Sequence, residues 1–341
     1  MNELARRLGI DFPLVQAGMG GVAGVALAAA VAEAGAGGVL ALYRSRPDTI
    51  AACVRQMLAR TSRPFGVNLI PELMDPGALL EQVRAVLDAV TRPVFFVFYG
   101  LPTTAATTAI ARSGCELLIM VGSVAELRTA RKHEPAGVIL QGTEAGGHLL
   151  GRQPLERLVA EALAASGGVD LLAAGGIGGG HAFRTLYNEG VAGCVCGTLF
   201  VATHESLAHA DYKQRLLDSG PEDTEITSVF EVGWPGRRHR VLRNRLTAAA
   251  PGAFPTTFIG FTNVAGVRHP VPRYSAAIPS EHTEGRIDEM AMYCGHSVRG
   301  VTAIVPARQR VETFVAEFRG CFPEALPGFP VQSDGGTRWT S

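Results

Sequence analysis

The sequence predicts an α/β fold: a (β/α)8 TIM barrel followed by a smaller C-terminal cap. Short apolar runs alternate with longer segments of helical character, and the repeat of ~25–30 residues is typical of βα units. The nearly all-apolar runs are typical of parallel strands that are covered on both faces, and eight of them suffice to close a barrel. With 341 residues, of which 47% are hydrophobic, the chain is long enough for such a domain and an appendage.

The expected strands follow one another along the first part of the chain. They are Phe12–Ala17, Gly38–Leu42, Phe65–Ile70, Pro93–Tyr99, Glu116–Val121, Gly137–Gln141, Asp170–Ala174 and Gly193–Cys196. Between them, segments such as Asp75–Val90 and Leu155–Ala165 place Leu, Val and Ala at helical spacing near acidic or Asp-Pro starts, which predicts crossover helices. We therefore expect the barrel domain over residues 1–218.

Residues 219–341 lack this rhythm and are expected to form a cap that covers the barrel mouth and contributes to the substrate site. Residues 221–279 are rich in Pro, Arg, Thr and Gly and predict an irregular or partly helical cap. Helices are expected again at Ile287–Gly295 and Pro306–Phe318, with the C-terminal helix packing back on the barrel. Phe329–Ser341 is expected to be a loose tail.

Charge and composition exclude several function classes. Lys+Arg and Asp+Glu both number 31, so nothing indicates a nucleic-acid partner. No signal peptide or membrane span is expected, because the most apolar stretch, residues 22–42, is broken by glycines and Glu33. The six cysteines lack paired C-x-x-C spacing, which argues against a metal site and favours reduced thiols in the cytoplasm. Cys194 and Cys196 point to the same side of a strand. They can be interpreted as small apolar packing residues or as a pair with metal or redox chemistry, and we expect packing.

A histidine follows the sixth expected strand, on the rim where barrel enzymes keep their active sites. Residues 141–148 read QGTEAGGH and deliver His148 onto a floor lined by Gly146 and Gly147. An imidazole with a reference pKa near ~6.5 suits proton transfer near neutrality. We predict that His148 is the catalytic base, and the alternative is a core histidine bonded to a backbone carbonyl.

Glycine turns after the last two strands indicate a phosphate site. Gly175 and Gly176 follow the seventh strand, and Gly197 and Thr198 follow the eighth. Backbone N–H groups and helix N-termini at such turns bind phosphate without Lys or Arg, so a phosphate-bearing cofactor is expected. The turn at 18–23 also matches the G-x-G-x-x-A of a dinucleotide-binding Rossmann fold, but the eight-strand count favours the barrel.

Six segments taken in order resemble the FMN-dependent nitronate monooxygenases, formerly called 2-nitropropane dioxygenases. They are PLVQAGMGG at 13–21, FGVNL at 65–69, FYGLP at 98–102, QGTEAGGHLLG at 141–151, AAGGIGGG at 173–180 and GTLFVATHES at 197–206. The histidine loop is also similar to that of the FMN-dependent enoyl-acyl-carrier-protein reductase II, a member of the same superfamily. The resemblance therefore fixes the cofactor better than the reaction.

The resemblance implies FMN as the cofactor, with His148 beside its reactive face. Gly18 and Met19 would line the flavin ring, Asn68 and Gln141 would bond its polar edge, and the two late turns would hold its phosphate. The implied cofactor-binding residues are Gly18, Met19, Asn68, Gln141, Gly146, Gly147, Gly175, Gly176, Gly197 and Thr198.

The chain departs from the family pattern at three places. His181 and Leu199 stand where relatives commonly have an arginine after the seventh and eighth strands, and Cys294-Gly295-His296-Ser297 replaces a common Ala-Gly-Gln. His296 and Ser297 are therefore candidates for the substrate pocket, although a polar pair in a cap can also be purely structural.

The function that this resemblance implies is oxidation of alkyl nitronates with O2. The segments at 98–102 and 212–224 look more like the monooxygenase branch. Two alternatives stay open: an NAD(P)H-dependent reductase of enoyl thioesters, and a flavin-binding protein without catalysis. A small-molecule substrate is expected in the first two cases, and a homo-oligomer is left open.

Overall fold

The computed structural model describes residues 2–250, 252–264 and 267–320, and its centre is a parallel eight-stranded sheet. In chain order the strands are β1 (Leu14–Gln16), β2 (Val39–Ala41), β3 (Gly66–Leu69), β4 (Phe95–Tyr99), β5 (Glu116–Val121), β6 (Gly137–Gln141), β8 (Asp170–Ala174) and β9 (Gly193–Cys196). All eight expected strands are confirmed. A parallel bridge between Val15 and Gly37 joins the two ends of the sheet, so the strands close into a barrel and not a doubly wound sheet.

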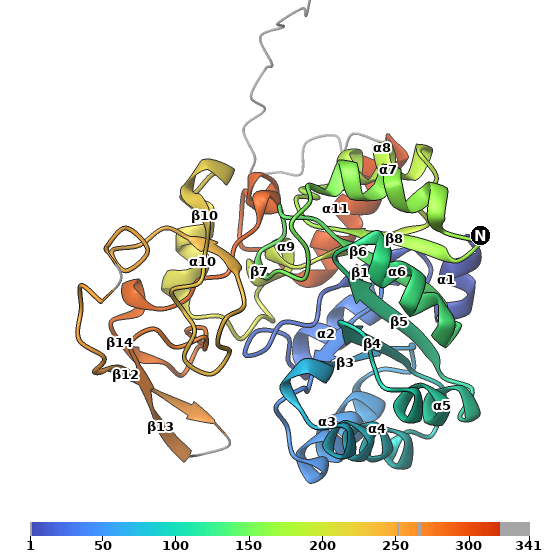
Figure 1. Ribbon diagram of the computed structural model, residues 1–341, viewed down its shortest axis with the longest axis horizontal. Coiled ribbons are helices and arrows are strands. Elements are labelled where there is room, and N and C mark those ends of the chain that lie inside the picture. The colour runs from blue at the N-terminus through green and yellow to red at the C-terminus, as the bar shows by residue number, and fades with distance from the viewer. Residues whose placement is uncertain (1, 251, 265–266, 321–341) are drawn as a thin grey trace, which may run out of the picture.

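Helices cover the outside of this barrel (Figure 1). They are α2 (Val25–Glu33), α3 (Pro47–Arg60), α4 (Pro76–Ala89), α5 (Thr104–Arg112), α6 (Val124–Ala130), α7 (Leu155–Ala165) and α8 (Gly180–Asn188). The short helix α1 (Glu3–Leu8) adds Leu4 and Leu8 to the interior cluster, and α9 (Thr198–Val201) follows the last strand. Figure 1 shows α10 (Ala210–Leu217) on the cap side, near β10. The two quoted crossover helices are confirmed as α4 and α7. Asp75 begins α4 by accepting the N–H groups of Gly77 and Ala78, and Pro76 at the first position needs no hydrogen bond there.

The barrel interior is filled by side chains that point inward from successive strands. Val15, Val39, Phe95, Leu118 and Ile139 are buried in one cluster inside it, while a larger apolar cluster lies between the strands and the helices. Most strands are therefore apolar on both faces, which is why they are readable in the sequence as continuous apolar runs.

The cap is built from strands, so the expectation of an irregular or partly helical segment is wrong. Two strands, β10 (Thr224–Thr227) and β11 (His239–Leu242), pair antiparallel, and a two-residue strand, β7 (Gly147–His148), joins them from the barrel side. A second small sheet holds β12 (Phe258–Val264), β13 (Val267–Pro272) and β14 (Glu284–Gly285). Figure 1 shows these strands to one side of the barrel.

The helix expected at Ile287–Gly295 is also absent. Only the short 3-10 turn η4 (Ile287–Glu289) forms, and the chain then runs extended beside β11. The N–H of Leu242 donates to the carbonyl of Met292 at 2.9 Å, and Val241 bridges to Tyr293. Hydrogen bonding to a distant strand thus overrides the local apolar spacing that suggested a helix.

The last described helix packs back on the barrel, as expected. This helix, α11 (Ala307–Arg319), places Phe314 6.2 Å from both Phe12 and Phe183, measured between ring centroids. Residues 321–341 lie outside the described residues, and with them the expected tail. Within the described ranges, every helix is too short or too polar to cross a membrane.

Candidate functional site

The histidine loop is fixed to the end of its own strand by the side chain of Gln141. Its amide nitrogen donates to the carbonyl of His148 at 2.9 Å, and its amide oxygen accepts the N–H of Leu150 at 2.8 Å. Gly147 has φ +85°, a conformation that only glycine adopts without strain. Gln141 therefore sets the position of His148 through the backbone.

Two further side chains hold the middle of the loop. Glu144 accepts the N–H of Leu155 at 2.9 Å, at the N-terminus of α7, where a carboxylate is favoured. Arg240 on β11 donates from Nε to the carbonyl of Thr143 at 2.9 Å, and its guanidinium is buried. The loop is thus attached both to the barrel and to the cap.

Glycines let the loop meet the cap backbone directly. A Cβ on Gly146 would lie 2.5 Å from the backbone nitrogen of Gly295, and a Cβ on Gly295 would lie 2.5 Å from that of Gly146. The N–H of His296 donates to the carbonyl of Glu144 at 2.9 Å next to this contact. The structure therefore places Gly146 against the cap.

Aromatic rings surround His148. Trp234 stacks on its imidazole with ring centroids 3.8 Å apart and an angle of 21°, and Tyr293 and His239 lie at 5.1 and 5.2 Å. Tyr99, at the end of β4, meets the edge of Trp234 at 5.6 Å. This aromatic cluster of Tyr99, His148, Trp234, His239 and Tyr293 shields the imidazole from water.

Two polar atoms in this cluster are buried without a hydrogen-bond partner among the described residues: Nε2 of His148 and the hydroxyl of Tyr99. Buried polar atoms are nearly always bonded, so unpaired ones of this kind are expected where a ligand binds. Burial raises the pKa of Tyr99, which keeps its hydroxyl protonated as a donor.

His148 is held neutral. Burial lowers its pKa to about 3, with smaller contributions from His239, Arg44 and Arg237. A neutral imidazole with a free Nε2 can accept a proton, which is the requirement for a general base.

His239 faces His148 across the β7–β11 pair and has a defined tautomer. Its Nδ1–H donates to the carbonyl of Arg237 at 3.0 Å, which leaves Nε2 to accept the N–H of Phe230 at 3.3 Å. Burial lowers its pKa as well. Both of its ring nitrogens are used within the protein, so His239 supports the site and His148 is the imidazole free to react.

These lowered pKa values predict a loss of stability in acid. Below the unfolded-state value of ~6.5 the unfolded chain binds protons that the folded chain excludes, so stability falls as the pH drops toward about 3. For His148 alone the loss at pH 4.5 is expected to reach about 2–3 kcal/mol.

Urea denaturation at pH 7 and pH 4.5 measures this loss. The variant His148→Gln should lose less stability than the native chain between the two pH values. Equal losses in both proteins would show that His148 is not held neutral by burial.

The predicted phosphate turns pack against the histidine loop and the cap. Gly175 and Gly176 have φ +114° and +72°, and a Cβ on Gly176 would lie 3.0 Å from Cβ of Glu144. Thr198 accepts the N–H of Gly295 at 3.1 Å through its hydroxyl. Gly197 immediately precedes α9.

The remaining predicted residues lie at the same rim. A Cβ on Gly18 would collide with Asn68, whose amide nitrogen donates to the carbonyl of Val97 at 3.0 Å. Met19 lies beside Gly197, since its sulfur is 3.4 Å from a Cβ built there. The turns after β1, β3 and β9 are thus brought together, although the Asn68 amide nitrogen is already bonded within the protein.

His296 and Ser297 lie beside the glycine turns. His296 begins the 3-10 helix η5 (His296–Gly300), and its Cβ is 3.8 Å from a Cβ built on Gly176, while Ser297 is buried. Cγ of Arg299, in the same short helix, is 2.9 Å from a Cβ built on Gly178. A cationic side chain from the cap thus stands at the turn where the sequence lacks the arginine that is common in relatives.

Sequence reasoning missed the residues that cover His148. Trp234 donates its indole N–H to Glu72 at 2.8 Å, and Glu72 also forms an ion pair with Arg237. Glu72 lies in η1 (Pro71–Leu73), the 3-10 turn after β3. No spacing in the sequence links a turn near residue 72 to a cap loop near residue 234. The one local signal was the position of Trp234 between Gly233 and Pro235-Gly236, which is typical of a tight turn.

The cysteines of the described residues are free, and Cys194 and Cys196 are buried in the apolar cluster between β9 and the helices. Over residues 2–250, 252–264 and 267–320, no three His, Cys, Asp or Glu side chains gather as a metal-binding group. The buried position of Cys194 and Cys196 in the apolar cluster supports the interpretation that they are packing residues.

Comparisons with known proteins agree with this architecture. The sequence profile of the nitronate monooxygenase family matches residues 2–317. A nitronate monooxygenase of Pseudomonas aeruginosa is 29% identical over 371 aligned positions, which cover 94% of this chain and 99% of the relative. The solved structure of a nitroalkane oxidase from Streptomyces ansochromogenes has a TM-score of 0.75 and 27% identity, covering 93% of this chain and 98% of its own.

A second kind of relative is named as a carboxyl-CoA dehydrogenase. The (3aS,4S,5R,7aS)-5-hydroxy-7a-methyl-1-oxo-octahydro-1H-indene-4-carboxyl-CoA dehydrogenase of Mycobacterium tuberculosis is 31% identical over 247 residues, covering 72% of this chain and 67% of the relative. Because the family profile spans nearly all the described residues, the resemblance seen in the six sequence segments is confirmed. The chain belongs to the nitronate monooxygenase family, a family of FMN-dependent oxidoreductases.

Proposed function

We propose that this protein oxidises alkyl nitronates with O2 and FMN, with His148 as the base. The observation that carries the proposal is the buried, neutral imidazole of His148, whose Nε2 has no partner among the described residues at the rim of the barrel. Nε2 is thus a free acceptor for the weakly acidic proton on the carbon next to a nitro group.

The residues at the rim fit FMN. Gly18 and Met19 would lie along its ring, and the turns at Gly176 and Gly197 would meet its phosphate with backbone N–H groups. Arg299 would add the positive charge that the turns themselves lack. When bound, FMN would accept electrons from the substrate and pass them on to O2.

The side chains of the protein would bind the substrate, shield it from water and remove its proton. The Nε2 of His148 would take the proton from the substrate carbon, and the aromatic cluster would exclude water from the resulting anion. The Tyr99 hydroxyl, kept protonated by burial, is a donor for an anionic oxygen. Gln141 and Arg240 would keep the imidazole in place through the loop backbone.

The alternative is an FMN-dependent reduction of an enoyl thioester by NADH or NADPH. The relative named as a carboxyl-CoA dehydrogenase favours it, because that name implies chemistry beside a thioester. The two reactions would share most of the rim residues and differ in what reduces the flavin.

Anaerobic mixing separates the two functions. We expect the FMN-loaded protein to lose its visible absorbance within seconds when mixed with ethyl nitronate, and much more slowly with NADH or NADPH. Faster bleaching by a nicotinamide would favour the reductase. A yellow protein that neither reagent bleaches would indicate flavin binding without catalysis, and a colourless protein that takes up no added FMN would contradict the cofactor assignment.

A further inference from the structure

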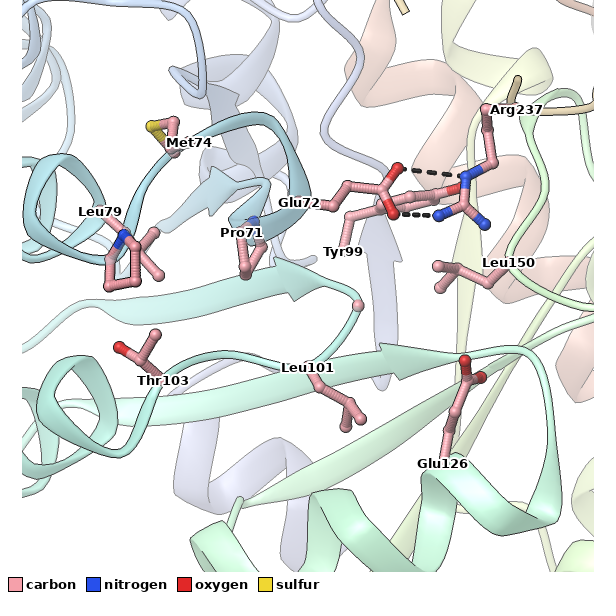
Figure 2. A pocket seen from close by; sticks show the side chains of 12 residues that line it. Pro71, Glu72, Met74, Leu79, Tyr99, Leu101, Thr103, Glu126, Leu150 and Arg237 are labelled. Atoms are coloured by element: carbon pink, nitrogen blue, oxygen red, sulfur yellow. Dashed lines mark hydrogen bonds and ion pairs between the residues drawn. The ribbon is translucent and has the colours of Figure 1, made fainter. Parts of the chain in front are cut away.

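A cavity of about 280 Å³ opens at the rim, next to the aromatic cluster (Figure 2). It lies between the turn after β3, the turn after β4 and the cap loop that carries Arg237. It is lined by Pro71, Glu72, Met74, Pro76, Leu79, Tyr99, Gly100, Leu101, Thr103, Glu126, Leu150 and Arg237. No residue proposed to hold FMN is among them.

Two of its three charged side chains neutralise each other, and the third, Glu126, is bonded within the described residues only to a backbone N–H. Glu72 and Arg237 form an ion pair, which Figure 2 shows beside Tyr99, and Glu126 accepts the N–H of Gly122 at 2.7 Å. The remaining walls are mainly leucine, proline and methionine side chains, among them Leu101 and Leu150. The apolar walls favour an apolar guest, and the Glu126 carboxylate would repel an anionic one.

Tyr99 and Trp234 connect the wall of the cavity to His148. Tyr99 lines the cavity and meets the edge of Trp234, which in turn covers the imidazole of His148. Trp234 stands in a turn whose Gly233 and Gly236 have φ +96° and +71°. Contacts between these aromatic rings thus connect the wall of the cavity to the proposed base.

We propose that this cavity binds the apolar tail of the substrate while its reactive carbon lies at His148. The inference rests on the proposed function, since it assigns a tail to the molecule that His148 deprotonates. A cavity of ~150 Å³ holds a benzene-sized group, so this one takes a chain or ring of roughly ten carbons. The substrate class is thus a nitro compound with a medium-length apolar chain, and not only the smallest nitroalkanes.

The first test measures binding of straight-chain 1-alkanols, from ethanol to 1-octanol, to the FMN-loaded protein. Equilibrium dialysis gives the affinity, and the emission of Trp234 is followed in a Trp339→Phe background, because the chain has two tryptophans and Trp339 lies outside the described residues. Each added methylene should tighten binding about fourfold. Affinity that does not change with chain length would overturn the proposal.

The second test fills the cavity. Leu101→Phe and Leu150→Phe should each weaken 1-octanol binding at least tenfold and leave ethanol binding unchanged, because only the longer chain reaches the filled volume. The matched control is Leu186→Phe on α8, a half-buried leucine that is not part of the cavity lining. If the control weakens octanol binding as much as the cavity variants, the cavity is not the binding site.

A third measurement distinguishes this inference from the proposed function. For nitronates from two to eight carbons, KM should fall with chain length in the native enzyme and stop falling in the two cavity variants, with kcat little changed. Nitronate turnover with a KM that does not change with chain length would refute only the proposal that the cavity binds the apolar tail. Chain-dependent alkanol binding without nitronate turnover would refute the proposed reaction and leave the apolar site standing.

Discussion

Replacing His148 with alanine is expected to lower turnover of a neutral nitroalkane by about a hundred- to ten-thousand-fold, the usual contribution of a general base. A preformed nitronate needs no proton removed, so its turnover should fall much less. The protein should stay yellow, because the proposed phosphate contacts come from other turns. Steady-state oxygen consumption with nitroethane and with ethyl nitronate measures both effects.

The matched control for this variant is His282→Ala, which removes an exposed histidine of the cap and should leave both activities unchanged. Undiminished turnover of nitroethane by His148→Ala would remove the imidazole from the mechanism. An equal loss with nitroethane and ethyl nitronate would instead assign His148 to substrate binding and not to proton transfer.

Replacing Gly146 with alanine is expected to lower the free energy of unfolding by about 4 kcal/mol, a large share of the stability of a typical domain. The added Cβ would lie 2.5 Å from the backbone nitrogen of Gly295, and backbone atoms cannot move aside as a flexible side chain can. Either the loop or the cap strand beside it must shift. Urea denaturation followed by circular dichroism measures the loss.

Two companion variants make this prediction specific. Gly295→Ala approaches the same contact from the other side and should destabilise the protein to a similar extent. Gly77→Ala, at the exposed start of α4, meets only the tip of the Asp75 side chain at 3.2 Å and should be nearly neutral. A stable Gly146→Ala protein would show that the loop and the cap can separate at little cost.

The barrel was predictable because its strands are determined locally. A run such as Val94–Tyr99 is apolar on both faces whatever its neighbours are, so periodicity and turn residues suffice to find it. The position of the candidate site at the rim could be predicted from the topology, since the carboxyl ends of parallel strands meet at one end of a barrel. His148 was identified for that reason.

The cap was not predictable in the same way, because its strands depend on distant partners. β11 pairs on one side with Thr224–Thr227 and on the other with Gly147–His148, about ninety residues earlier in the chain. The extended segment at 290–295 is likewise held by β11. A local pattern carries no information about such pairings.

Within the site too, the contacts that could not be predicted join residues that are distant in the sequence. Gln141 and Asn68 were assigned to the cofactor by resemblance, and the structure shows their amide nitrogens bonded to nearby backbone carbonyls. Trp234 reaches His148 from the cap, and Arg299 stands next to Gly178 although 121 positions separate them in the chain. Each contact joins side chains whose proximity is created only by the completed fold.

The pairing of β7 with β11 has a consequence for how such enzymes can diversify. Because His148, the proposed base, is itself part of a strand completed by the cap, exchanging one cap for another during evolution or in the laboratory also rebuilds the edge on which His148 sits. New substrate preferences should therefore arise more readily by point changes in the loops around this pair than by grafting whole segments between relatives.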